Sequence, residues 1–296
     1  MLNVPKIKQA QHLDIPLASN HNVTTPLRYP GGKTVLVDFV TGIIDMLGMS
    51  NLTYVEPYAG GAGIALRLLK NGVVSDIVIN DYDENVYAFW NSVVNQSSAF
   101  LKKFDEVEPT LDEWKRQRQI IHNPASELDR GFAFFFLNRT NRSGVINGGV
   151  IGGLEQSGRY KVSARYNKHS LREKLAFLGE YSSRIMVCCL DGQKIAEKYV
   201  SQPHTFTYLD PPYVMKGSSL YLNALSEQQH RSLAETLIHS TGMWMLTYDN
   251  AKLVKSLYKE SYGGIFSLRY TAASHRQANE LMAFSDELAE ILRFKY

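Results

Sequence analysis

The sequence predicts an α/β fold in which helices cover a doubly wound, mainly parallel sheet, and two observations lead to this prediction. Hydrophobic residues make up 44% of the 296-residue chain and charged residues 21%, so the chain can bury a full core. Five short apolar runs, each followed by an acidic or amide residue, alternate with stretches of helical periodicity, as in β-α-β units. These runs are 52–55, 77–79, 185–190, 206–209 and 243–248. Such sheets bind ligands at the carboxyl ends of their strands, where these polar residues would gather.

Two more apolar runs near the C-terminus predict an antiparallel pair of strands. They cover 264–270 and 280–285, and the polar segment between them is too short to hold a crossover helix. The last strand of the sheet is therefore expected to run antiparallel. Helices expected in the rest of the fold cover 64–69, 83–94 and 171–182.

A long stretch between the second and third runs predicts an inserted subdomain. Residues 96–169 are too many for a loop in a compact domain. They contain a polar helical pattern at 111–122, an apolar one at 128–137, and then a glycine-rich segment. We therefore expect a main α/β domain formed by 1–95 and 170–296, and an inserted, mainly helical subdomain that ends in a glycine-rich hairpin or loop.

The inserted stretch also concentrates positive charge. The whole chain has a formal charge of +3, but 130–168 contains seven basic residues against one acidic residue. A basic stretch is most often a solvated surface, and that alternative applies here too. Six glycines between 144 and 158 accompany the charge, and this composition suits a loop that lies along a phosphate backbone. The sequence thus predicts nucleic acid as a partner.

Other features argue against several classes of protein. No stretch reaches the ~18 uncharged residues of a membrane helix, so we expect a cytoplasmic protein without a membrane partner. The only cysteines, Cys188 and Cys189, are adjacent, which excludes a disulfide scaffold and a cysteine-based zinc site. The segment around Lys33 is similar to a phosphate-binding loop, but Leu27 stands where that loop requires a glycine. An ATPase is rejected on that ground.

A glycine-rich turn at 56–63 follows the first run and precedes a helical pattern. Glycines at such a turn let the backbone bend tightly and approach a bound nucleotide. Gly61 and Gly63 match the first two glycines of a dinucleotide fingerprint, but Leu66 occupies the third position, so the motif alone is weak. Asp81 follows twenty residues after Gly61, where a carboxylate can hold a ribose diol. A tight turn followed by a helix-capping aspartate is the alternative.

The clearest chemical signal is Asp210-Pro211-Pro212-Tyr213, directly after the fourth run. Two prolines remove two backbone N–H donors, so this segment presents hydrogen-bond acceptors. If Asp210 and the Pro211 carbonyl accept both hydrogens of a nucleobase amine, the nitrogen lone pair can attack an electrophile. Tyr213 offers a ring on which a flipped-out base can stack. These four residues are the predicted catalytic residues, and a simple turn after a strand is the alternative.

Together these motifs resemble the Dam-like, D12 class of N6-adenine DNA methyltransferases. The resemblance extends from Leu27 to about Ser285. The segments that carry it, in chain order, are 28–33, 55–61, 80–81, 136–140 and 210–213. It implies a methyltransferase-type sheet, S-adenosylmethionine as the cofactor and double-stranded DNA as the substrate.

The resemblance also implies which residues hold the cofactor. Tyr29 and Lys33 would border its site, Asp81 would hold the ribose, and Asp191 would contact the adenine amine. Family members often carry an aromatic residue after that last acid, whereas this chain has Gly192. Acidic residues at the strand ends suit a sulfonium cation and would repel a pyrophosphate. The predicted cofactor site comprises Tyr29, Lys33, Glu56, Pro57, Tyr58, Ala59, Gly60, Gly61, Asp81, Asp191, Gly192 and Asp210.

The inserted subdomain is the predicted DNA-recognition part. Arg and Asn side chains suit the edges of G and A, although each can equally contact a phosphate. The candidate contacts, in order of preference, are Arg139 and Arg142, then Asn141, Arg165 and Asn167. The glycine-rich segment departs from the family's hairpin, so the resemblance implies no particular target sequence. A restriction endonuclease acting on the same site is a candidate partner that the sequence leaves open.

The predicted function is therefore methylation of adenine N6 in duplex DNA, by direct displacement on a flipped base, without a metal or a covalent enzyme intermediate. Cytosine-N4 methylation on the same acceptor platform is the nearest alternative. A catalytically silent DNA-binding protein on the same fold is another, and the intact 210–213 segment argues against it. A nicotinamide dehydrogenase is disfavoured by Leu66 and by the acidic strand ends.

Overall fold

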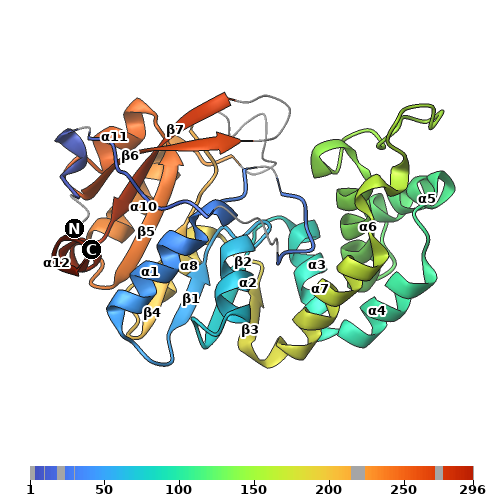
Figure 1. Ribbon diagram of the computed structural model, residues 1–296, viewed down its shortest axis with the longest axis horizontal. Coiled ribbons are helices and arrows are strands. Elements are labelled where there is room, and N and C mark those ends of the chain that lie inside the picture. Colours follow the sequence, from blue (N-terminus) through green and yellow to red (C-terminus); the bar gives the residue numbers. More distant parts are fainter. Residues whose placement is uncertain are drawn as a thin grey trace.

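The centre of the molecule is a mixed β-sheet with helices on both faces (Figure 1). The computed structural model describes residues 4–9, 11–18, 24–29, 31–214, 224–270 and 276–295. Within these residues the sheet has seven strands in the order β3-β2-β1-β4-β5-β7-β6. The strands are β1 (Thr53–Glu56), β2 (Asp76–Asn80), β3 (Ile185–Cys188), β4 (Thr205–Leu209), β5 (Met243–Asp249), β6 (Tyr262–Tyr270) and β7 (Arg276–Phe284). All seven predicted apolar runs are strands, so the predicted α/β class is confirmed.

The sheet is parallel from β3 to β5 and antiparallel at its other edge. The predicted antiparallel pair is confirmed, but each of its strands begins earlier than expected. The later strand, β7, lies between β5 and β6, and its Glu280 is opposite Asp249 of β5. This register brings a residue from near the end of the chain to the carboxyl ends of the parallel strands.

Helices cover both faces because the parallel strands bury side chains on both sides. On β4 and β5, Tyr208 and Met245 belong to one apolar cluster, while Leu209 and Leu246 belong to the other. Helices α1 (Val37–Leu47), α2 (Gly63–Lys70) and α12 (Asp286–Lys295) pack into the first cluster. Helices α8 (Gly192–Tyr199), α10 (Glu227–Ile238) and α11 (Lys252–Leu257) pack into the second.

The helical insertion extends beyond the β3 edge of the sheet (Figure 1). Its centre is α6, which packs against α3 and α5 and buries nearly every residue of its middle turns. The rings of Phe89, Phe100 and Phe135 meet there, with centroids 5.7–5.9 Å apart. The helices are α3 (Glu84–Asn95), α4 (Ser97–Glu106), α5 (Leu111–His122), α6 (Glu127–Thr140) and α7 (Lys168–Glu180).

The prediction for α5 has the observed bounds, and the other three helices predicted here are displaced by a few residues. Helix α4 was not predicted. Because the apolar cluster of the insertion continues through α3 into the sheet, no gap in the core marks residues 95 and 170 as limits. The predicted division into two domains stays a prediction.

The glycine-rich segment begins as a short hairpin. Asn141 bridges to Val150, and the Arg142 amide donates to the Gly149 carbonyl at 3.0 Å. Turns follow, and the Gln156 side chain stabilises them by donating to the Ile151 carbonyl at 2.9 Å. This agrees with the predicted hairpin or loop. No helix in the described part of the chain is long and apolar enough to cross a membrane.

Candidate active site

The carboxyl ends of the parallel strands bring the predicted acidic residues to one edge of the sheet. Asn80 joins three of these strand ends through its side-chain amide. Its Nδ2 donates to the Pro57 carbonyl at 2.8 Å and the Leu190 carbonyl at 2.9 Å, and its Oδ1 accepts from the Leu190 amide at 2.8 Å. Asn80 thereby holds the segments that carry the predicted cofactor residues in fixed positions. In the sequence, Asn80 was marked as an amide residue that follows an apolar run.

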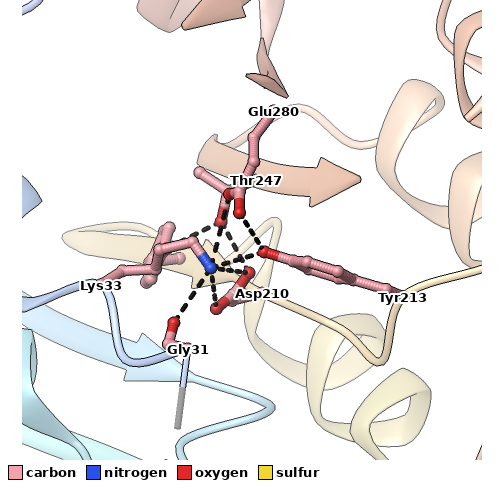
Figure 2. A network of polar contacts seen from close by, with 7 residues as sticks. Gly31, Lys33, Asp210, Tyr213, Thr247 and Glu280 are labelled. Carbon is pink, nitrogen blue, oxygen red and sulfur yellow. Dashed lines mark hydrogen bonds and ion pairs between the residues drawn. The ribbon is translucent and has the colours of Figure 1, made fainter. Parts of the chain in front are cut away.

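Lys33 is the centre of a buried polar network at this edge (Figure 2). Its Nζ donates to both carboxylate oxygens of Asp210, at 3.2 and 3.0 Å, and to the Tyr213 hydroxyl at 2.6 Å. It also donates to the Gly31 carbonyl at 3.1 Å and lies 3.4 Å from Oε2 of Glu280. Lys33 is only 5% exposed. The structure therefore brings together Lys33, Asp210 and Tyr213, which the sequence placed 177 and 180 residues apart.

Two residues that the sequence prediction missed complete this network. The Thr247 hydroxyl on β5 donates to Oδ1 of Asp210 at 2.9 Å, and the Tyr213 hydroxyl donates to Oε1 of Glu280 at 2.7 Å. The amide of Val214 donates to Asp249 at 3.1 Å, which ties the chain after the prolines to the end of β5. The only sequence signal for Glu280 was an acidic residue at the start of an apolar run.

The glycine turn accommodates the chain's own N-terminal segment. A Cβ at Gly60 or Gly61 would lie 2.6 or 2.8 Å from atoms of Tyr29, and one at Gly63 would lie 2.2 Å from Oγ1 of Thr34. Gly60 also has a φ of +46°, which favours glycine. The close approach to these glycines is thus made by Tyr29 and Thr34, on either side of Lys33 in the chain. Pro30 of the same motif lies outside the described residues.

Asp81 ties the glycine turn to the end of β2. One of its carboxylate oxygens accepts from the Gly60 amide and the other from the Asp83 amide, both at 3.0 Å. Burial raises the pKa of Asp81 to about 7, although these two backbone hydrogen bonds act in the opposite direction. The residue that caps α3 is Asp83, which accepts from the Asn85 amide at 2.8 Å. The helix-cap alternative for Asp81 is therefore wrong.

Glu56 is enclosed by the protein at the end of β1. It is a buried residue, and its Oε1 accepts from the Ala65 amide in the first turn of α2 at 3.1 Å. Burial raises the pKa of Glu56 to about 8, and the negative charge of Asp210 acts in the same direction. Glu56 is therefore mainly neutral at pH 7 and contributes less charge to the acidic edge than the sequence suggested.

We expect Glu56 to make folding stability depend on pH. Its folded pKa of about 8 lies above the ordinary 4.5, so its contribution is complete below pH 4.5 and is lost as pH rises toward 8. Urea unfolding should show wild-type stability falling over this range, by up to about 1.4 kcal/mol per pH unit. Glu56→Gln should fall less steeply, whereas the exposed Glu290→Gln should match the wild type. Equal slopes for all three proteins would contradict this assignment.

Asp191 and Gly192 begin helix α8. Asp191 caps the helix by accepting from the Gln193 amide at 2.8 Å. A Cβ on Gly192 would lie 2.3 Å from the Tyr58 ring, so glycine is required for that ring to pack there. Burial, and secondarily Asp191, raises the pKa of the Tyr58 hydroxyl. The structure thus places an aromatic ring beside Asp191 by way of the glycine turn.

The predicted DNA contacts fall into two groups. Arg142 and Arg165 are exposed. Arg139 is half-buried, donates to the Arg165 carbonyl at 2.7 Å, and has its pKa lowered to about 10 by burial. Asn167 is exposed and caps α7 by accepting from the Ser170 amide at 2.9 Å. Arg142 and Arg165 are therefore the more accessible candidates.

Asn141 is fully buried, at 0% exposure. Its Oδ1 accepts from the indole of Trp114 at 2.7 Å, and its Nδ2 donates to the carbonyls of Val145 and Ile146 at 2.9 and 2.8 Å. A base contact would require these bonds to break, so the buried position of Asn141 favours a role in shaping the hairpin.

Tyr160 is an exposed aromatic residue that was not among the predicted contacts. It is 56% exposed and lies near the guanidinium groups of Arg159 and Arg165.

A buried junction connects the hairpin to the segment that carries Lys33. The Arg28 amide donates to Oδ1 of Asn138 at 2.8 Å, and Nδ2 of Asn138 donates to the Arg28 and Gly144 carbonyls at 2.9 and 3.0 Å. The Arg28 guanidinium also donates to the Asn141 carbonyl at 2.9 Å. Lys33 is the fifth residue after Arg28, so the hairpin and the network around Lys33 share a support.

Comparison with known proteins assigns this site to a class. Residues 29–273 match the D12 class N6 adenine-specific DNA methyltransferases, and the chain belongs to that family. The chain is also similar to the type II methyltransferase M.MjaIII of Methanocaldococcus jannaschii. The two are 26% identical over 202 residues, which cover 63% of this chain and 68% of the relative. The protein is an adenine-specific DNA methyltransferase, and the predicted resemblance and activity are confirmed, against the cytosine-N4 alternative.

Proposed function

We propose that this enzyme transfers a methyl group from S-adenosylmethionine to N6 of an adenine that is flipped out of duplex DNA. The observation that carries the proposal is the convergence of Asp210, Lys33 and Tyr213 at the end of β4. Base flipping is required because the reacting nitrogen of a paired adenine is inside the duplex. In the proposed complex, the acceptor segment that begins at Asp210 contacts the reacting amine.

The mechanism depends on hydrogen-bond acceptors that point at the amine. Asp210 and the Pro211 carbonyl accept its two hydrogens, and Pro211 and Pro212 contribute no competing N–H. The nitrogen lone pair is then directed away from the ring and can attack. S-adenosylmethionine, when bound, supplies an electrophilic methyl group on a cationic sulfur. The Tyr213 ring supports the flipped base, and Glu280 orients that ring through the hydroxyl at 2.7 Å.

The residues at the strand ends fit this cofactor. Asp81 lies against the glycine turn with both oxygens directed at backbone amides, and each oxygen retains a second lone pair for a ribose hydroxyl. Asp191 lies beside the Tyr58 ring, so an acceptor for the adenine amine and an aromatic surface are adjacent. Lys33, whose ammonium pairs with Asp210, borders this site. A cationic sulfonium matches these carboxylates.

Asp81→Asn should weaken cofactor binding without changing the methylated sequence. A ribose diol held by a carboxylate contributes about 1.5–3 kcal/mol as charge-assisted hydrogen bonds. Calorimetry with S-adenosylmethionine should therefore show a higher dissociation constant for Asp81→Asn. The matched control is Asp83→Asn, which removes a carboxylate two residues away that only caps α3. An unchanged dissociation constant for Asp81→Asn would mean that Asp81 holds the glycine turn in place and does not bind the ribose.

We propose that the inserted region, predicted as 96–169, reads the DNA through its glycine-rich segment. Arg142 and Tyr160 line one surface hollow together with Arg159, and Arg165 approaches the same tyrosine ring. Guanidinium groups around an exposed aromatic ring suit phosphates and unstacked bases. Arg139, Asn141 and Asn167 support this surface through their bonds to the backbone.

Salt dependence should identify the phosphate contacts. The logarithm of DNA affinity falls with the logarithm of salt concentration by about 0.9 per phosphate contact. Arg142→Ala and Arg165→Ala should each either reduce that slope by about one or relax target specificity at a cost of about 1–3 kcal/mol. The control is Lys194→Ala, an exposed lysine on α8 of the sheet domain. If both arginine variants keep the wild-type slope and target, the insertion is not the recognition region.

The experiment that tests the whole proposal is single-molecule sequencing of DNA from a host without adenine methylation that expresses the protein. It should report N6-methyladenine in one sequence context. Unmodified DNA or N4-methylcytosine would overturn the proposal. By analogy with the type II relative, we propose that a companion restriction endonuclease cuts the same sequence. If that endonuclease exists, it should cut the unmethylated sequence and leave the methylated sequence intact.

A further inference from the structure

Glu280 occupies an unusual place for a carboxylate. It lies on β7, the second strand from one edge of the sheet, is 2% exposed, and is opposite Asp249 in the β5–β7 ladder. Burying a charge costs several kcal/mol unless partners compensate for it. Its partners here are the Tyr213 hydroxyl, which donates to Oε1, and the Lys33 ammonium, which lies near Oε2. Both partners belong to the network around Asp210. The free-energy cost of burying Glu280 therefore indicates that this carboxylate serves the proposed active site.

The Lys33 ammonium lies against the carboxylate that the target amine needs. In the structure it donates to both oxygens of Asp210 and to the Tyr213 hydroxyl. Thr247 already donates to one of those Asp210 oxygens. Oδ1 of Asp210 thus accepts from two donors, and the ammonium also takes one of the two lone pairs of Oδ2, so an adenine amine that enters this site competes with the ammonium for Asp210. A buried ammonium can leave one carboxylate at low cost only if a second carboxylate remains beside it.

We propose that Glu280 is a positioning residue that retains the Lys33 ammonium while Asp210 turns to the target amine. The ammonium lies 3.0 Å from Oδ2 of Asp210 and 3.4 Å from Oε2 of Glu280. A small rotation of the lysine side chain therefore exchanges one carboxylate for the other without leaving a buried charge unpaired. Figure 2 shows the two carboxylates on either side of the ammonium. The inference rests on the proposed role of Asp210 as the acceptor for the amine.

Without the charge of Glu280, the ammonium would lose a carboxylate that lies 3.4 Å away on the side opposite Asp210. The attraction between Lys33 and Asp210 would then be less opposed, and Asp210 would be a weaker acceptor for the amine. The defect would lie in the methyl-transfer step and not in cofactor binding. A residue that only anchors β7 would instead lower stability and affect all steps together.

The test is single-turnover methylation by Glu280→Gln with saturating DNA and S-adenosylmethionine. Gln has the same shape, and its amide oxygen still accepts from Tyr213, but it carries no charge. We expect the methyl-transfer rate to fall by about 10-fold or more, a coupling of the size measured between contacting charges. The cofactor dissociation constant should stay within about twofold, since Glu280 touches Lys33 and not the predicted ribose site. The exposed Glu287→Gln on α12 is the matched control and should keep the wild-type rate.

A double variant separates positioning from a structural role. If the ammonium is the obstacle, Glu280→Gln with Lys33→Gln should transfer methyl faster than the product of the two single losses predicts. Simple multiplication of the losses would overturn the inference, and so would a Glu280→Gln rate equal to wild type. Glu280→Asp, which keeps the charge, should retain more activity than Glu280→Gln, and equal loss in both would also overturn it. If Asp210 is not the acceptor for the amine, variants of Asp210 should still methylate DNA, and this result is distinct from any result with Glu280 variants.

Discussion

Asp210→Ala should abolish methyl transfer while S-adenosylmethionine still binds. In the proposed mechanism this carboxylate accepts a hydrogen of the target amine, and orienting or proton-accepting groups of this kind contribute about 10²–10⁴ to a rate. We expect a loss of at least about 1,000-fold in single-turnover methylation, toward the upper part of that range. Calorimetry should show nearly wild-type cofactor affinity, because Asp81 and Asp191 contact the cofactor in the proposed site and Asp210 faces the amine.

Two controls make this result interpretable. Asp210 also pairs with Lys33, so Asp210→Asn, which keeps the size and one acceptor oxygen, separates loss of charge from loss of the side chain. Asp286→Ala removes an exposed carboxylate at the start of α12 and should behave as wild type. Turnover near the wild-type rate in Asp210→Ala would contradict the acceptor mechanism. Equal loss of methylation and cofactor binding would make Asp210 part of the cofactor site.

The sequence predicted the convergence at the sheet edge because strand ends share that edge in any parallel sheet. Asp81, Asp191 and Asp210 each follow an apolar run, and the structure places all three there. Asp210 and Tyr213 belong to one tetrapeptide, so their proximity needed no tertiary information. Lys33 came only from the family resemblance, since nothing in its local pattern indicated that it would reach β4.

Glu280 and Thr247 could not be found this way, because their positions depend on the register between β5 and β7. A shift of one residue would turn Glu280 to the opposite face of the sheet. Asn141 shows the reverse difficulty. A polar residue in a basic, glycine-rich segment suggests an exposed side chain, but the indole of Trp114, 27 residues earlier, provides a buried partner. Sequence periodicity carries no information about such long-range hydrogen bonds.

Asn138→Ala should destabilise the protein and impair DNA-dependent methylation together. Asn138 is 1% exposed and makes three hydrogen bonds, to the Arg28 amide and to the carbonyls of Arg28 and Gly144. Truncation leaves one buried and two partly buried backbone groups without this partner, and a fully buried group in that state costs about 1–3 kcal/mol. Relaxation of the hairpin recovers part of this, so we expect about 2–4 kcal/mol of lost stability in urea unfolding.

The location of Asn138 gives this prediction a functional component. The same side chain holds Arg28, five residues before Lys33, and Gly144, in the hairpin that carries Arg142. Loss of the junction should therefore reduce methylation of duplex DNA even below the unfolding temperature, while cofactor binding changes less. Asn123→Ala, at the exposed end of α5, should change stability by less than about 0.5 kcal/mol. Wild-type stability in Asn138→Ala would mean that the bond from the Arg28 guanidinium to the Asn141 carbonyl is sufficient to hold the hairpin against the catalytic segment.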